Sequence, residues 1–226
     1  MRLQTFLGRI LVVLWAVPAC LCAKPFNEMT IDRLGGTIMD QPADGSKPYA
    51  LGTTSVVNKG DVLTVYDQGW VILKTHNGDR IGLDGNTVAV VDEFYIEGPD
   101  RQVRFLLQKG TMLFKVNGRD SRQSFFEINT GGEVTSINDT RCILVYDPSA
   151  AALDVKFIAG KMTVLDKDNE EKFKVENSER TWKDGKMMAE DPTPLDQLDV
   201  VNFNKFFEGE PRLKPRDNNF LLPGAD

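Results

Sequence analysis

The sequence predicts an all-β fold, a twisted β-solenoid or β-sandwich of many short strands, followed by one short C-terminal helix. Three observations support this prediction. Apolar runs recur between residues 60 and 165 at about 8–12 residue spacing, which is typical of such folds. Asn-Gly and Asp-Gly steps separate the runs, and both favour tight turns because they tolerate positive φ. Apolar and polar residues alternate within runs such as 111–116, which places one face on a core and the other in water.

Composition limits the class of protein. The chain has 226 residues, of which 41% are hydrophobic and 27% charged, as is usual for a soluble globular protein. Its 33 Asp and Glu outnumber its 27 Lys and Arg, giving a net charge of −6. This balance argues against a nucleic-acid partner, because binding to phosphates needs clustered cations. The sequence also predicts no cofactor.

Residues 1–23 are predicted to be a signal peptide. Arg2 and Arg9 give it a positive start, and the apolar run 10–17 is too short to span a bilayer of about 30 Å. Cleavage at the end of this segment is one interpretation. Lipid attachment at Cys20, as in a bacterial lipoprotein, is the other. We therefore expect an exported protein of the periplasm or cell surface, which is tethered by lipid alone if Cys20 is modified.

The strands are expected in two segments of the chain, and most of them lie in the second. Residues 24–51 form an N-terminal segment of loops with one short strand at 36–39, and residues 52–188 form the β-domain. Within the domain, the predicted strands and apolar clusters are 62–66, 70–75, 80–83, 87–91, 94–96, 103–107, 111–116, 124–128, 134–137, 142–145, 153–157 and 162–164, with short final strands near 173–175 and 182. Cys142 is predicted to be a buried, inert thiol, because free cysteine is among the most buried residue types.

Residues 189–226 are predicted to form a linker, a short helix and a tail. Thr193 can cap the helix, Pro194 fits its first position, and the helix is expected over 195–207. Gly209 would end it. The tail that follows is expected to be poorly ordered.

Aromatic residues supply the candidate binding positions. Phe203, Phe206 and Phe207 either pack the terminal helix onto the sheet or form an exposed anchor for a partner, since amphipathic helices can dock in grooves. Trp70 is a further candidate for a partner-binding or sugar-binding surface. Both interpretations remain open from the sequence.

Residues that could carry metal or catalytic chemistry are scattered. His76 is the sole histidine, and no His or Cys is spaced to join it in a metal site. We interpret it as an exposed turn residue. Asn77, Asp79, Asp84 and Asn86 offer the oxygen ligands that calcium takes, but they lack EF-hand spacing and are explained as turn formers.

Two adjacent acidic pairs, Asp92 with Glu93 and Glu170 with Glu171, are weak candidates for a glycosidase. Such an enzyme needs two carboxylates facing each other across a cleft, whereas neighbours on a strand point to opposite faces. The sequence therefore predicts a protein that is not an enzyme.

Several motifs resemble those of one known family. A strand, then Gly110, then alternating apolar residues resembles the signature of the FecR periplasmic domain, and two later elements and a closing turn follow in the same order. These motifs occupy residues 106–116, 126–130, 155–164 and 181–185, and the resemblance covers residues 52–188.

The resemblance implies an extracytoplasmic β-module that is related to the FecR signalling domain but lacks its cytoplasmic anti-sigma part. We expect a non-enzymatic binding or sensing module of the bacterial cell envelope, with an envelope protein or a glycan as its partner. A structural or surface carbohydrate-binding protein is the alternative, and a signalling regulator acting through a partner is a third. Membrane contact is expected only through a lipid on Cys20.

Overall fold

The structure is a computed structural model that describes residues 27–98, 100–118, 124–165, 170–173, 176–188 and 193–209. The predicted signal peptide, the lipid-attachment candidate Cys20 and the tail after Gly209 lie outside the described residues. In the described part, no helix has the length and apolar character needed to cross a membrane.

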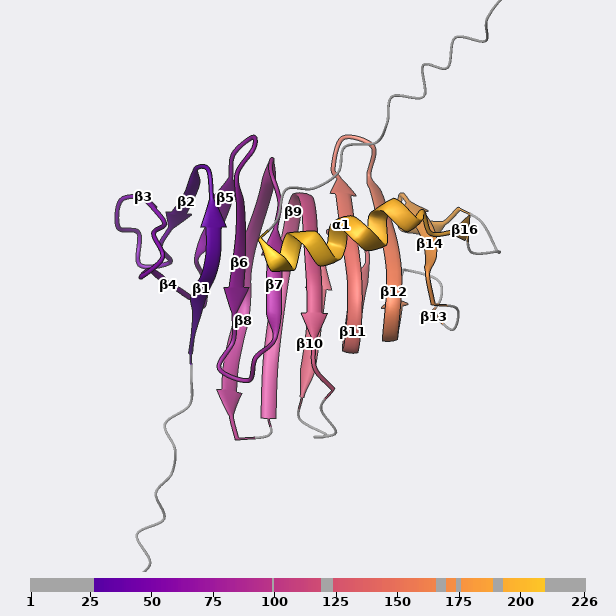
Figure 1. Cartoon of the computed structure of the whole chain (residues 1–226), viewed down its shortest axis with the longest axis horizontal. Coiled ribbons are helices and arrows are strands. Elements are labelled where there is room, and N and C mark those ends of the chain that lie inside the picture. Colours follow the sequence, from indigo (N-terminus) through magenta and orange to yellow (C-terminus); the bar gives the residue numbers. More distant parts are fainter. Residues whose placement is uncertain are drawn as a thin grey trace, which may run out of the picture.

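The described residues form strands and one helix, as the all-β prediction requires. The elements are β1 (Glu28–Gly35), β2 (Ile38–Gln41), β3 (Tyr49–Ala50), β4 (Val56–Asn58), β5 (Val62–Val65), β6 (Trp70–Lys74), β7 (Arg80–Leu83), β8 (Thr87–Glu97), β9 (Asp100–Val116), β10 (Phe125–Asn129), β11 (Val134–Asp147), β12 (Ala152–Leu165), β13 (Glu170–Phe173), β14 (Ser178–Lys183), β15 (Lys186–Met187), β16 (Thr193–Pro194) and α1 (Gln197–Glu208). The strands lie side by side in one open sheet, and α1 crosses it (Figure 1). Among the described pairings, β9 with β10 is parallel and the others are antiparallel.

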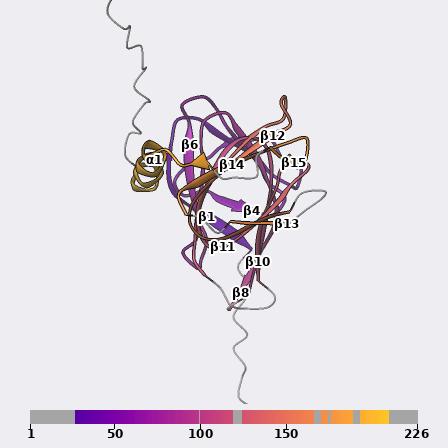
Figure 2. The ribbon, with the colours of Figure 1, turned by 90° about the vertical axis from the view of Figure 1, so that its right-hand side faces the viewer.

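Long strands that change partners fold this sheet into two layers. The first half of β9 pairs with β8 and β10, whereas its second half pairs with β7 and β11. In the same way, β12 pairs first with β14 and then with β13. Figure 2 shows the strands surrounding a central region, with α1 outside them.

We name the two layers by their relation to α1. The helix-side layer contains β4, β1, β6, β7, residues 111–116 of β9, residues 140–147 of β11, residues 152–159 of β12, β14 and β15. The opposite layer contains β3, β2, β5, β8, residues 100–109 of β9, β10, residues 134–138 of β11, residues 161–165 of β12 and β13.

Glycines mark two of the points where strands pass between layers. Gly110 in β9 has φ 95° and Gly160 in β12 has φ 108°, a region that residues with a Cβ rarely adopt. A Cβ on Gly110 would lie 2.5 Å from Thr87 Oγ1, and one on Gly160 would overlap the carbonyl oxygen of Asp139. The glycine in the 106–116 motif therefore has a defined role, which is to let β9 bend.

Apolar side chains from both layers meet in one core. Phe114 of the helix-side layer and Phe126 of the opposite layer contact each other edge to face, with ring centroids 5.7 Å apart. Cys142 is fully buried and makes no disulfide, which confirms the prediction for this thiol. Burial raises its pKa, so the thiol stays protonated and unreactive.

The structure differs from the predicted strand plan in two ways. Several predicted pairs of short strands are single long strands, such as β8 and β9, because bulges keep them continuous through polar positions. The N-terminal segment 24–51 also contributes β1, which pairs with β4 and β6. The sheet therefore continues without a break across residue 52.

Candidate functional site

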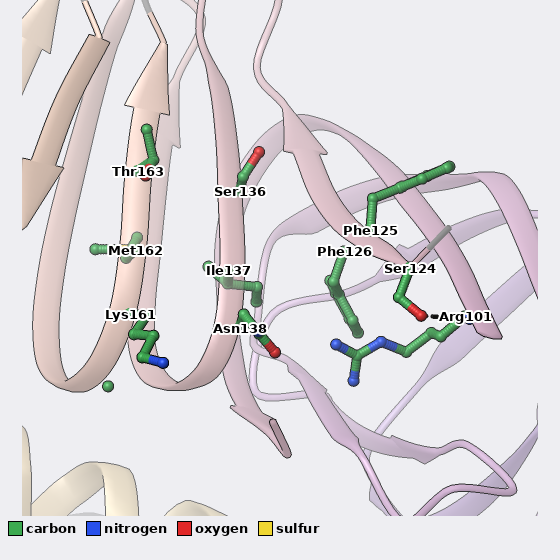
Figure 3. Close-up of a pocket in the computed structure, with 11 residues that line it drawn as sticks. Arg101, Ser124, Phe125, Phe126, Ser136, Ile137, Asn138, Lys161, Met162 and Thr163 are labelled. Atoms are coloured by element: carbon green, nitrogen blue, oxygen red, sulfur yellow. Dashed lines mark hydrogen bonds between the residues drawn. The ribbon is translucent and has the colours of Figure 1, made fainter. Parts of the chain in front are cut away.

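A pocket of about 480 Å³ opens in the opposite layer where β10, β11 and β12 meet (Figure 3). We call it the seam pocket. Its volume falls in the range of about 300–1,000 Å³ that is typical of small-molecule sites. The residues that define its character are Arg101, Phe126, Ile137, Asn138, Lys161 and Met162.

The seam pocket exists because β10 and β11 diverge. Their pairing runs from Glu127 with Ser136 to Asn129 with Val134. Beyond it, β11 is irregular, and the Thr140 side chain links it to β12. The Thr140 hydroxyl donates to the carbonyl oxygen of Lys161 at 2.5 Å and accepts from the backbone N–H of Asn138 at 3.1 Å. A space remains between the start of β10 and the middle of β11.

The walls of the seam pocket reach from the surface to the core. Phe126, Ile137 and Met162 are at most 3% exposed and form its apolar part. Ser136 and Lys161, by contrast, are exposed at its mouth. Figure 3 shows residues of β12 on one side, those of β10 on the other and those of β11 between them.

A buried ion pair fixes one wall of this pocket. Arg101 Nη1 donates to Asp79 Oδ2 at 2.8 Å, and the two side chains are 1% and 0% exposed. Arg101 also donates to the carbonyl oxygen of Asn117 at 3.1 Å, and the Asn117 backbone N–H donates to Asp79 Oδ1 at 2.9 Å. The guanidinium lies 5.4 Å from the ring centroid of Phe126.

Asp79 is thus more than a turn residue. Its carboxylate is engaged by Arg101, which the sequence interpretation did not consider. The described residues contain no group of three or more His, Cys, Asp or Glu side chains that could hold a metal ion. Arg101 stands among other charged residues of β9, so nothing in the sequence marked it as the buried partner of Asp79.

The other predicted chemical residues occupy turns and surface positions. His76 is exposed, Asp84 Oδ1 accepts from the backbone of Gly85 at 2.7 Å, and Asn86 has φ 63° in its turn. Asp92 lies 3.7 Å from Arg104, and Glu93 forms an ion pair with Lys59 at 2.6 Å. Glu170 and Glu171 belong to β13. None of these residues lines the seam pocket as described.

The C-terminal helix α1 begins at a different residue from the one predicted. Asp196 is its N-cap and accepts from the backbone N–H of Leu198 at 2.9 Å. Thr193 is not the cap, because Thr193 and Pro194 pair with β14. At the other end, Gly209 has φ 72° and terminates the helix as predicted.

Phe203, Phe206 and Phe207 pack α1 onto the sheet. Each is at most 3% exposed, and together with Leu195 they contact four residues of the helix-side layer, Ile72, Leu113, Ile143 and Ile158. The ring of Trp70 lies edge-on to Phe206 with centroids 6.0 Å apart. In this arrangement the sheet covers the three rings, and their binding of a partner stays a prediction.

Polar contacts hold both ends of α1. Near its start, Asp199 pairs with Lys156 of β12 at 2.8 Å. At its end, Arg33 of β1 donates to the carbonyl oxygen of Glu208. A cation at the C-terminus of a helix is favourable because the helix dipole places negative charge there. The helix is therefore an integral part of the fold.

The fold is shared with a protein of known structure. Two crystal structures, at 1.65 and 2.50 Å resolution, of a proposed anti-sigma factor from Parabacteroides distasonis each match with a TM-score of 0.50 and 14% sequence identity. The match covers 64% of this chain and 64% of the other, so the chain spans less than two thirds of that protein. At this identity the likeness shows the fold alone. No family model and no curated protein matches the sequence.

Proposed function

We propose that this protein is a non-enzymatic, extracytoplasmic binding or sensing module of the bacterial cell envelope, related to the FecR signalling domain and acting through a partner. The observation that carries the proposal is the seam pocket, in a fold shared with a proposed anti-sigma factor. That likeness supports a signalling role. Export rests on the predicted signal peptide.

The composition of the seam pocket supports binding. Apolar walls meet a few polar donors, an arrangement typical of ligand sites. The charged side chains that line the described pocket are Arg101 and Lys161. The Arg101 guanidinium is paired with Asp79. Its role in the pocket is therefore to hold this wall in place.

The FecR relationship rests on motifs whose structural roles are now defined. Gly110 and Gly160 occur in the two motifs with a central glycine, and each lies where a long strand bends between layers. The alternative of a sugar-binding surface at Trp70 gains less support, because that ring packs against Phe206.

Photo-crosslinking in intact cells tests the binding role. A photoreactive amino acid at Ser136, exposed at the mouth of the pocket, should form a covalent adduct with one envelope protein. The matched control is Asp67, exposed on the turn between β5 and β6, which should give no such adduct. Absence of an adduct at Ser136, together with hydrolytic activity in the purified protein, would refute the proposal.

Cell fractionation tests the predicted location. The full chain should reach the envelope fraction, and deletion of residues 1–23 should leave it in the cytoplasm. A Cys20→Ser variant separates the two export interpretations, because it loses membrane association only if Cys20 carries a lipid.

A further inference from the structure

The geometry points to a ligand class for the seam pocket: a small amphipathic organic anion, with its apolar body against Phe126, Ile137 and Met162 and a carboxylate head at Lys161. This inference rests on the proposed binding function and specifies what is bound. The carboxylate could belong to a fatty acid or to a small peptide, and the experiment below separates these two sources.

The charges that line the seam pocket favour an anionic ligand. The chain carries a net charge of −6, yet the charged residues that line the described pocket are the cations Arg101 and Lys161. Asp79 balances Arg101 at 2.8 Å. Lys161 takes part in none of the ion pairs found among the described residues. The neighbouring carboxylate of Glu176 accepts from the backbone N–H of Gly160 at 3.4 Å and, within the described part of the chain, forms no ion pair with Lys161.

A preformed apolar floor is the second argument. Phe126 contacts Phe105, with centroids 6.3 Å apart, and Phe114, with centroids 5.7 Å apart. Its ring is therefore held in place before any ligand enters. Ile137 and Met162 complete the floor from β11 and β12 and are each 3% exposed. A rigid pocket binds an apolar body at low cost in ordering, since little side-chain freedom is lost.

The order of these features along the pocket sets the orientation of the ligand. Lys161 and Ser136 are exposed at the mouth, while the apolar residues lie on the core side. An anion with an apolar body matches this gradient with its head outward. An elongated carboxylate fits better than a compact inorganic anion, because the latter would leave the apolar floor empty.

Calorimetric titration of the purified protein provides the test. The probes are octanoate and its neutral counterpart 1-octanol, together with N-acetylphenylalanine and N-acetylphenylalaninamide. At least one carboxylate should bind about twofold to fivefold more tightly than its neutral counterpart, as expected for one exposed ion pair. If octanoate is the tighter of the two carboxylates, the source is a fatty acid. If N-acetylphenylalanine is tighter, the source is a peptide.

Two variants and a control locate the interaction. Lys161→Gln should abolish the preference for the carboxylate. The control is Lys109→Gln, because Lys109 is an exposed lysine of β9 that does not line the pocket, and this variant should keep the preference. Ser136→Trp should fill the mouth and weaken binding of every probe more than tenfold while the melting temperature stays within a few degrees. Each of these results supports the assignment.

Other results overturn it. The ligand class is wrong if none of the probes binds the wild type, if neutral and charged probes bind equally, or if Lys161→Gln keeps the preference. In that case an adduct at Ser136 in cells would still support the proposed function. Conversely, probe binding by a protein that forms no adduct and has hydrolytic activity would leave the ligand class standing and refute the proposed function.

Discussion

Arg101 and Asp79 join the two layers of the sandwich through a fully buried ion pair, with Nη1 and Oδ2 2.8 Å apart. Arg101 comes from β9 in the opposite layer and Asp79 directly precedes β7 in the helix-side layer. Removing two charges from water is expensive, so such a pair is stable only when its remaining polar atoms are also bonded. Asn117 supplies two of these bonds, whereas Arg101 Nε is buried without a hydrogen-bond partner among the described residues.

We predict that Asp79→Asn destabilises the fold by about 3–5 kcal/mol, because it leaves the Arg101 charge buried without a counterion. The double variant Asp79→Asn with Arg101→Met should recover part of this loss. Urea-induced unfolding measures both. The matched control is Asp32→Asn, which breaks the half-buried pair with Arg80 and should cost at most about 1 kcal/mol. Equal losses at Asp79 and Asp32 would contradict the assigned importance of the buried pair.

The bend at Gly110 leads to a second prediction, which compares the loss of stability at two glycines. Gly110→Ala should cost about 2–5 kcal/mol, because it combines positive φ with a clash against Thr87. Gly45→Ala is the control, since Gly45 has φ 78° but open space around its Cβ position, and it should cost about 1 kcal/mol. Thermal unfolding compares the two. Similar losses would show that close packing at Gly110 contributes little.

The packing of α1 gives a third prediction. Phe206→Ala should lower the free energy of unfolding by about 3 kcal/mol, because this ring is 3% exposed between α1 and the sheet. Val201→Ala, on the same helix but 41% exposed, should change it by less than about 0.5 kcal/mol. Hydrogen exchange should also show faster opening of α1 in the Phe206 variant alone. Unchanged protection in that variant would mean that the aromatic contacts do not hold the helix.

The buried carboxyl group of Asp40 should make the stability of the fold depend on pH. Burial chiefly, together with the charge of Asp61, raises its pKa to about 6, although the hydrogen bond from Tyr49 at 2.8 Å acts in the opposite direction. The folded state therefore holds this proton more tightly than the unfolded chain. The contribution of Asp40 to the free energy of unfolding should therefore fall by about 2–3 kcal/mol as the pH rises from 4 to 7.

The Asp40→Asn variant isolates this contribution. It should be about as stable as the wild type near pH 4 and more stable above pH 6, because it removes the cost of burying the ionised carboxylate. Asp67→Asn at an exposed turn serves as the control and should show no such change. Denaturation curves measured from pH 4 to 8 would contradict the prediction if Asp40→Asn were less stable at pH 7.

Local chemistry made most of the secondary structure predictable. The Arg80–Leu83 strand, the turns at Gly78 and Asn86, and the helix end at Gly209 follow from alternation and from residues that tolerate positive φ. The helix start was misplaced because Thr193 could cap a helix or join a sheet. Only pairing with β14 decided this, and that contact is distant in the sequence.

An all-β chain with one terminal helix can be read from the residues alone, because hydrophobic periodicity and turn residues act over short distances. The bends of β9 and β12 between the layers, the divergence of β10 from β11, and the pairing of Arg101 with Asp79 emerge only from long-range contacts. These features depend on which strands pair and where their ladders end. The seam pocket is a product of that pairing, which is why Lys161 and Ser136 carry no local signal of a shared site.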